Sequence, residues 1–259
     1  RLPDGRELQL SELVVGLYLL YFVLRRSPAL RLQKGEHLRF NRPQLCTMLC
    51  IAAPVASEKV ILTTAQIVST AIVAPLGTVA IAANSFAITA ESLCYMPAYG
   101  IQSAAAMLVG QSVGAGRRNM ARRLGWVTVL IGIAVMIITG GLLYILAPQM
   151  MAILTPNPDI IALGARVLRI EAFAEPLFGA SIVAGGVFQG VGSTLIPTLF
   201  NLGTMWGIRI PLAWLAAPRW GLPGVWAAMC LELCVRGVLY LTRLVGKRWL
   251  PPGDQNVQA

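Results

Sequence analysis

The chain contains few charged residues and a single histidine. Only 12% of its 259 residues are charged, against about 25% in an average soluble domain. The one histidine, His37, lies in a basic stretch, so a histidine metal site and a Ser/His/Asp triad are both excluded within this chain. The Gly-x-x-x-x-Gly-Lys-Ser/Thr loop of nucleotide-driven motors is also missing. We therefore expect a protein that is not an enzyme and needs no cofactor.

The cysteines do not form a metal or redox motif either. Two pairs of cysteines are spaced i,i+4, which is not the Cys-x-x-Cys pattern of metal or redox sites, and we expect small, buried, reduced side chains. The chain starts at Arg1 without a signal-peptide pattern, and we expect it to be a fragment of something longer. The five cysteines are Cys46, Cys50, Cys94, Cys230 and Cys234.

Long apolar runs, by contrast, are abundant, and 56% of the residues are hydrophobic. A run of about 20 apolar residues spans a bilayer as a helix. Only helices or closed barrels satisfy their backbone there, and these runs lack the period-two alternation of barrel strands. We therefore expect an all-α membrane protein. The runs cover residues 8–24, 46–74, 78–110, 125–147, 160–189, 196–217 and 223–245.

These runs divide the chain into four parts. We expect residues 1–24 to be the end of a truncated transmembrane helix and residues 25–42 to be a basic cytoplasmic loop. Residues 43–248 would form a six-helix transmembrane bundle, and residues 249–259 a cytoplasmic tail.

The positive charge orients this bundle. The net charge is +10, and loops on one side hold thirteen Lys and Arg residues against three on the other. Cytoplasmic loops carry such an excess, so we place residues 25–42, 110–123, 190–195 and the C-terminus in the cytoplasm, with the bundle in the plasma (inner) membrane. The basic loops then face lipid headgroups, not nucleic acid.

Proline interrupts four of the expected helices, at Pro54, Pro97, Pro176 and Pro211. Each proline frees a backbone carbonyl that neighbouring helices or water must satisfy. Interrupted helices point to transport sites. The alternative is that proline is simply common in membrane helices.

Acids inside apolar helices need a reason, because burying a charge there costs at least about 2.5–3.5 kcal/mol. Glu58 follows a proline and would bind a proton, Na+ or an organic cation. Its alternative is an ion pair with Lys59, which adjacent positions on a helix disfavour. Glu91 is central in its segment, and its alternative is a structural carboxyl bonded to Ser92 or Tyr95.

A second pair of acids, Glu171 and Glu175, lies beside Pro176. Their spacing places both on one helix face, and repulsion between them favours proton exchange. For Glu175 we favour a functional role. For Glu171 we favour an ion pair with Arg166 or Arg169.

Other polar groups at membrane depth have structural explanations. Glu232 and Arg236 are spaced i,i+4 in the favourable order, and we expect an ion pair. Arg209 is expected to reach a headgroup or to neutralise an acid on another helix. Gln66 and Asn84 would line a cavity or join helices.

Seven short motifs follow one another along these segments. They are Ala53-Pro54 with Glu58, Ala74–Asn84, Tyr95–Gly100, Gly110-Gln111 with Gly114–Gly116, Phe188–Thr194, Arg209–Trp214 and Gly221–Ala228. Each is weak alone. In this order and at helical spacing, over residues 43 to 245, they resemble the C-terminal half of a multidrug and toxic compound extrusion (MATE) transporter.

The resemblance implies a fold and a function. The fold is a twelve-helix transporter, of which this chain holds the second lobe, a six-helix bundle, plus the end of a preceding helix. Its partners would be the N-terminal six-helix bundle, membrane lipid and a small organic substrate. The function would be antiport, which exports organic, often cationic, compounds in exchange for Na+ or H+. The family's coupling acids fall by position on Glu58 and Glu175, which would also be the ligands of a bound Na+.

Two alternatives stay open. A lipid-linked oligosaccharide flippase of the same superfamily would favour a cationic cavity, whereas the deep acids of this chain outnumber its deep arginines. The other alternative is a non-transporting membrane interaction half-protein. We predict an antiporter, with a coupling-ion and substrate site formed by Glu58, Glu175, Glu91, Gln66 and Asn84.

Overall fold

The computed structural model describes residues 13–18, 21–22, 42–246 and 249–250. Within the helix that begins at Arg42, the side chains of residues 43–45, 47–55 and 57–58 lie outside the described part. The side chain of Glu58 is therefore not described. The expected basic loop and C-terminal tail also lie almost entirely outside it.

The chain divides into two compact units, Arg1–Leu49 and Cys50–Ala259. In the first unit, the described residues between 13 and 22 are helical, and their side chains are exposed. They include large apolar groups such as Leu17 and Tyr21. A helix was predicted for this stretch.

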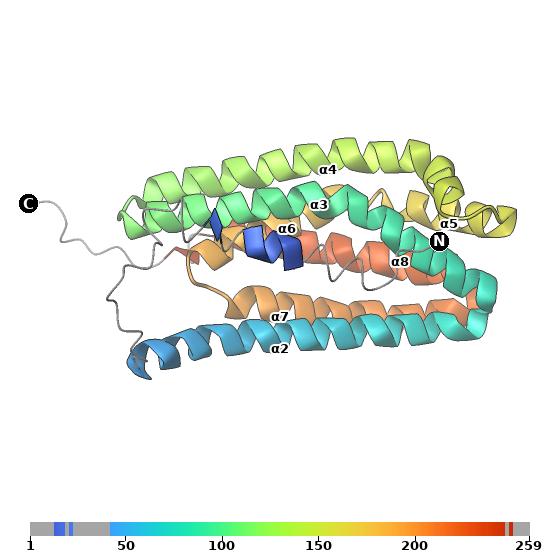
Figure 1. The fold of residues 1–259 in the computed structure, drawn as a ribbon, viewed down its shortest axis with the longest axis horizontal. Coiled ribbons are helices and arrows are strands. Elements are labelled where there is room, and N and C mark those ends of the chain that lie inside the picture. The colour runs from blue at the N-terminus through green and yellow to red at the C-terminus, as the bar shows by residue number, and fades with distance from the viewer. Residues whose placement is uncertain (1–12, 19–20, 23–41, 247–248, 251–259) are drawn as a thin grey trace, which may run out of the picture. The chain divides into compact units, whose positions relative to one another are not determined.

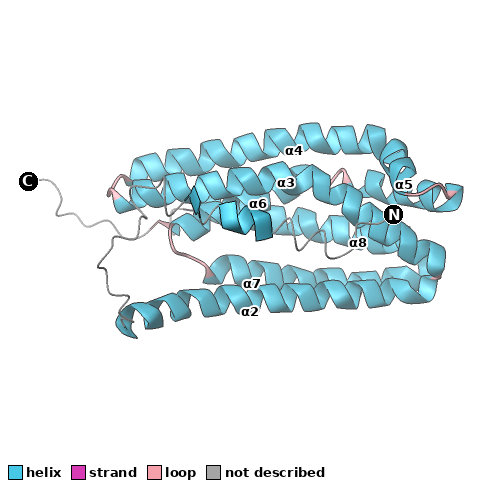
Figure 2. Ribbon diagram, viewed as in Figure 1, coloured by secondary structure: helices cyan, strands magenta, loops and turns pink. Residues whose placement is uncertain are grey.

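The second unit consists of helices joined by short loops (Figures 1 and 2). No strand occurs among the described residues. The elements are α2 Arg42–Val73, which begins in the first unit, the 3-10 turn η1 Ala74–Leu76, α3 Thr78–Gly114, α4 Arg118–Leu154, α5 Pro158–Glu171, α6 Glu175–Gly190, α7 Leu195–Thr204, the π-helical turn η2 Met205–Arg209, and α8 Ile210–Val245.

Several of these helices are long and apolar enough to cross a lipid bilayer. Four stretches of the described chain are long and apolar enough to cross it, namely Lys59–Leu76, α3, α4 and Leu195–Val245. Large apolar side chains such as Leu93, Ile138 and Trp214 are exposed on them, which is expected where lipid is the solvent. The predicted all-α membrane fold is confirmed.

The last of these stretches is two helices. At Gly221 the backbone leaves the helix (φ 61°, ψ −147°), a region that essentially only glycine occupies. The chain turns back there, so that the later part of α8 runs beside α7 and η2 (Figure 1). The two parts of α8 on either side of Gly221 approach each other closely. A Cβ added at Gly224 would lie only 2.9 Å from the carbonyl oxygen of Ala216. The two helices of this stretch match the two predicted segments 196–217 and 223–245.

Helix α6 is central to the unit and contacts α3, α4 and α8. Every side chain from Gly179 to Phe188 is buried. A Cβ at Gly186 would overlap the backbone of Gln102 on α3, and a Cβ at Gly237 on α8 would overlap the backbone of Leu177. Small residues allow this close approach of helices in membranes. The packing of α6 thus depends on glycine at its contacts.

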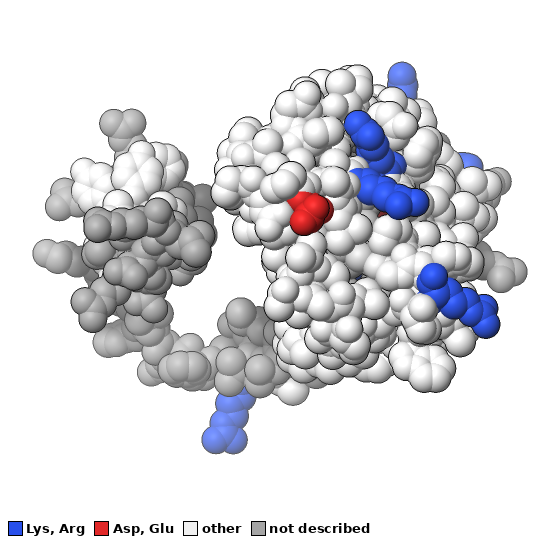
Figure 3. Space-filling model, turned by 90° about the vertical axis from the view of Figure 1, so that its right-hand side faces the viewer, with Lys and Arg blue, Asp and Glu red and all other residues white. Residues whose placement is uncertain are grey.

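The loops of this unit gather at two ends. The α3–α4 turn and the α6–α7 loop lie at one end, and the turns that follow α2 and α4 lie at the other (Figure 1). Two segments predicted to be cytoplasmic, 110–123 and 190–195, therefore share an end. Figure 3 looks onto the opposite end, whose surface is mostly uncharged, with scattered basic groups and an acidic group.

Replacing Gly186 by alanine should destabilise the bundle, because the added methyl group must displace the backbone of Gln102. Overpacking of this kind costs about 1–3 kcal/mol, measurable as a lower unfolding temperature of the detergent-solubilised chain. The control is Gly141→Ala on α4, where a Cβ meets nothing within 4 Å. Equal unfolding temperatures for both variants and the unmodified chain would contradict tight packing of α6.

Candidate functional site

Two acids, Glu171 and Glu175, flank a break between helices α5 and α6. Helix α5 ends at Glu171 and α6 begins at Glu175, with a turn at residues 172–174 between them. Within the turn, the amide of Ala174 donates to the carbonyl of Glu171 at 2.7 Å. Pro176 follows and has no amide to donate. The sequence predicted a single helix that carries both acids. The structure instead places a turn between the two acids.

Both carboxyl groups are buried without partners. Glu171 and Glu175 have no solvent exposure, and none of their carboxyl oxygens has a hydrogen bond within the described part of the chain. Gly140 on α4 packs against Glu175, since a Cβ there would lie 3.0 Å from the Cβ of Glu175. The thiol of Cys94 on α3 lies near the Glu175 carboxyl and interacts with it, although the two groups do not reach hydrogen-bond geometry. An isolated buried carboxylate is so costly that a proton or a cation must neutralise it.

The ion pair expected for Glu171 does not form, so that prediction is wrong. Arg169 donates from Nε to the carbonyl of Tyr144 at 3.4 Å, and its guanidinium lies 5.6 Å from the centre of the Tyr144 ring. Arg166 is exposed. The arginines lie on the exposed face of α5 while Glu171 lies on the buried one.

Glu91 on α3 belongs to the same group of acids. It is 7% exposed and has neither a hydrogen bond nor an ion pair with any described residue. The hydroxyl of Ser92 donates instead to the carbonyl of Thr89 at 2.7 Å, so Ser92 does not satisfy Glu91 as the structural alternative required. Glu91 repels both Glu171 and Glu175 electrostatically.

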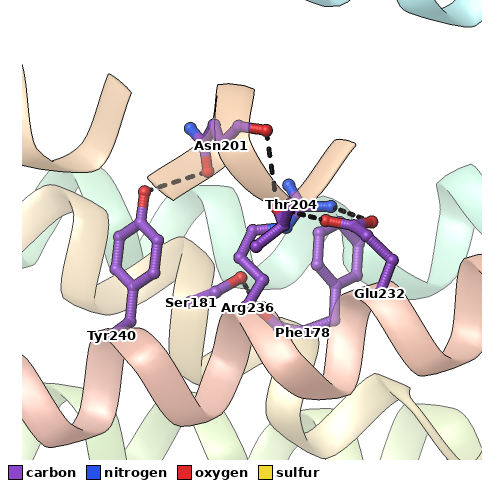
Figure 4. Close-up of polar contacts among 7 residues, drawn as sticks. All are labelled: Phe178, Ser181, Asn201, Thr204, Glu232, Arg236 and Tyr240. Carbon is purple, nitrogen blue, oxygen red and sulfur yellow. Dashed lines mark hydrogen bonds and ion pairs between the residues drawn. The ribbon is translucent and has the colours of Figure 1, made fainter. Parts of the chain in front are cut away.

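Glu232 on α8 differs, because its charge is compensated within the lobe. Arg236 donates from Nη2 to Oε2 of Glu232 at 2.8 Å, and the hydroxyl of Thr204 donates to Oε1 at 2.6 Å (Figure 4). Further along, the hydroxyl of Tyr240 donates to Oδ1 of Asn201 at 3.0 Å. The predicted ion pair is confirmed, and these contacts join α7 to α8.

Arg209 occupies an unusual backbone position at the end of the π-helical turn η2. Such turns are rare and frequent at functional sites. The side chain has no hydrogen bond or ion pair with any described residue, and its Nε is buried without a partner. Electrostatic attraction reaches it from Glu91, Glu171 and Glu232. Arg209 is thus close to the acids without being paired to one.

A cavity of about 330 Å³ lies between α2, α3, α6, η2 and α8. Its described charged lining is entirely basic and consists of Lys59, Arg209 and Arg236. Tyr95 and Tyr99 form one wall, with ring centroids 5.6 Å apart in an edge-to-face arrangement. A smaller cavity of about 90 Å³ shares Tyr95 and Arg209 with the first.

The structure separates the residues predicted to form one site. Gln66 lines both cavities, whereas Asn84 and Glu91 line only the smaller one. The Oδ1 of Asn84 also accepts a hydrogen bond at 3.0 Å from a tryptophan indole on α8. Glu175 lines neither cavity, and the side chain of Glu58 lies outside the described residues. No three acidic, cysteine or histidine side chains in the described part of the chain come together to hold a metal ion.

Sequence reasoning missed the basic lining and the tyrosine wall. One signal was available, because Glu91, Tyr95 and Tyr99 follow one another at i,i+4 and so share a helix face. The π-helical turn that positions Arg209 has no comparable signature in the sequence.

A helix break with buried acids and polar cavities among apolar helices are typical of membrane transporters. Comparison with known proteins identifies which kind. A family model described as MatE matches residues 54–215. The chain belongs to this family, that of the MATE transporters.

Individual relatives agree with this assignment. The probable multidrug resistance protein NorM of Chromobacterium violaceum is 30% identical over 68% of this chain and 40% of its own length. NorM of Thermotoga maritima is 27% identical over 91% of this chain and 51% of its own length. The chain spans about half the length of the curated relatives it matches.

Solved structures share the fold. A MOP superfamily transporter from Pyrococcus furiosus, described as having a binding pocket of reverse polarity that suggests a different function, matches with a TM-score of 0.81 at 16% identity. The match covers 91% of this chain and 54% of that one.

The Glu232–Arg236 pair should respond differently to single and double replacement. Arg236→Met leaves a buried, uncompensated carboxylate and should cost about 3–5 kcal/mol, whereas Arg236→Met combined with Glu232→Gln should recover most of that stability. Thermal unfolding of the purified chain in detergent measures both. An equal loss in the single and double variants would contradict a compensated pair.

Proposed function

We propose that the chain is the second lobe of a secondary active antiporter that exports organic compounds in exchange for Na+ or H+. The observation that carries this proposal is the break between α5 and α6, where Glu171 and Glu175 are buried without hydrogen-bond partners. A carboxyl group in that state needs a bound cation while it is sealed from water. Ionisable groups at membrane depth commonly serve such ion pathways.

Coupling follows from this need for neutralisation. With a cation bound, the acids tolerate a state in which the break is sealed. When the cation leaves, the bare carboxylates favour a state in which water reaches them. A ligand shifts such an equilibrium only by its difference in affinity for the two states. Rocking of two bundles would convert this shift into alternating access.

The remaining parts of the site keep their proposed roles. Glu58 and Glu175 would be the ligands where Na+ is the ion, and Glu91, Gln66 and Asn84 would contact the substrate. An N-terminal six-helix bundle would complete the transporter. We place it in the plasma membrane with the C-terminus in the cytoplasm, where the basic loops contact lipid headgroups.

A second candidate is a lipid-linked oligosaccharide flippase, and the basic lining of the larger cavity favours it. The excess of deep acids weighed against this function at the level of sequence. However, Glu171 and Glu175 line neither cavity. Glu232 compensates Arg236, which leaves Lys59 and Arg209 without a paired acid among the described residues.

Glu171→Gln, Glu175→Gln and Glu58→Gln in the full-length protein should each lower gradient-driven dye efflux by about tenfold or more, the effect of losing 1.4 kcal/mol. The reason is that glutamine cannot exchange a proton and is a poor ligand for Na+. Efflux is measured in cells in which the Na+ and H+ gradients are collapsed separately, and the gradient whose collapse stops efflux identifies the ion.

The matched control is Asp159→Asn, because Asp159 is an exposed acid in the first turn of α5. Its replacement should leave efflux unchanged. Undiminished efflux in all three glutamate variants would overturn the assignment of these acids.

A further inference from the structure

The charge lining the larger cavity has the wrong sign for an organic cation. Its described charged groups are Lys59, Arg209 and Arg236, contributed by α2, η2 and α8. We propose that this cavity binds the anionic group of an aromatic substrate, an aryl carboxylate or sulfonate. The inference rests on the proposed export function and assigns it a substrate class.

The basic groups keep donors available for such an anion. Arg209 uses none of its N–H groups in a hydrogen bond with a described residue. Arg236 contacts Glu232 through Nη2 alone, and its Nε is unpartnered. A guanidinium carries five donors in a fixed fork, and that fork matches a carboxylate or sulfonate. Lys59 adds an exposed ammonium group to the same cavity.

Of the three basic groups, only Arg236 is paired with an acid among the described residues. The Glu232 carboxylate is occupied by Arg236 and Thr204 (Figure 4). Glu91 faces the smaller cavity, and Glu171 does not line either one. Arg209 has a buried Nε without a hydrogen-bond partner, and in surroundings of low dielectric such a cation attracts an anion strongly.

The rest of the lining suits an aromatic ring. Tyr95 and Tyr99 stand edge to face along one helix face, and Phe178 lies 5.8 Å from Tyr95 in a second edge-to-face pair. Aromatic rings prefer this geometry, so a planar substrate can extend the row. The volume of about 330 Å³ is at the lower end of the range of small-molecule sites and fits a bicyclic aryl acid.

Binding of three ligands that share one ring system tests the charge preference directly. The purified chain, in nanodiscs of neutral phosphatidylcholine, is titrated with 1-naphthylacetate, 1-naphthylmethylammonium and 2-(1-naphthyl)ethanol. The carboxylate should bind at least about tenfold more tightly than the other two, as one favourable charge contact predicts. Tighter binding of the ammonium compound would overturn the proposal.

Substitutions of the lining residues test whether the preference for the carboxylate ligand arises in this cavity. Arg209→Gln and Lys59→Gln should each weaken naphthylacetate binding about tenfold while leaving the neutral alcohol unaffected, and Arg209→Lys should retain part of the affinity. Arg219→Gln is the control, because Arg219 is an exposed arginine outside this cavity. If Arg209→Gln fails to fold, Lys59→Gln decides alone. Unchanged binding in the folded variants would contradict the assignment.

Two further measurements, prenyl diphosphate binding and gradient-driven efflux, distinguish this inference from a lipid-headgroup site and from the proposed antiport function. A prenyl diphosphate that binds while naphthylacetate does not would overturn the aryl-acid assignment in favour of a lipid headgroup. Gradient-driven efflux together with a preference for the ammonium compound would overturn the inference and leave the proposed function standing. A preference for the carboxylate without any gradient-driven efflux would support anion binding in the cavity and overturn the proposed antiport function.

Discussion

A charge moved into hydrocarbon must be neutralised, and the deep charged residues of this lobe meet that demand in different ways. Glu232 is neutralised by Arg236 with help from Thr204, and the same contacts join α7 to α8. Arg209 is attracted by nearby acids without pairing to any of them. Glu171 and Glu175 have no partner in the described chain. The ion pair within the unit joins two helices, whereas the acids without a partner are the groups that we propose respond to an ion.

The backbone holds the unpaired acids in place. Helix α6 carries Glu175 as its first residue, at the end where the helix dipole favours negative charge. The same helix packs at backbone distance against α3 and α8 through Gly186 and Gly237. The central helix thus begins at a break, where the carboxyl groups of Glu171 and Glu175 are buried without a hydrogen bond or an ion pair among the described residues. Neither Glu171 nor Glu175 lines the larger cavity, so in the proposed mechanism ion and substrate need not compete for one group.

The sequence was sufficient to predict features that depend on neighbouring residues or on a periodic pattern. Long apolar runs predicted the helices, and the i,i+4 spacing of Glu232 and Arg236 predicted their ion pair, because both depend on residues within one helix. The spacing of Glu171 and Glu175 predicted that these acids repel each other, and they do interact electrostatically. It could not predict the turn at residues 172–174 that separates α5 from α6. The basic cavity could not be predicted, because its lining comes from several helices and depends on the π-helical turn at Arg209.

Reconstitution of the full-length protein in liposomes tests the central claim, that the acids at the α5–α6 break couple transport to an ion. In the double variant Glu171→Gln/Glu175→Gln, substrate exchange between the two sides at equilibrium should persist, because the cavity is intact. Accumulation driven by an imposed Na+ or H+ gradient should be lost, because no carboxyl remains there to exchange the ion. A double variant that accumulates substrate to the level of the unmodified protein would contradict the account.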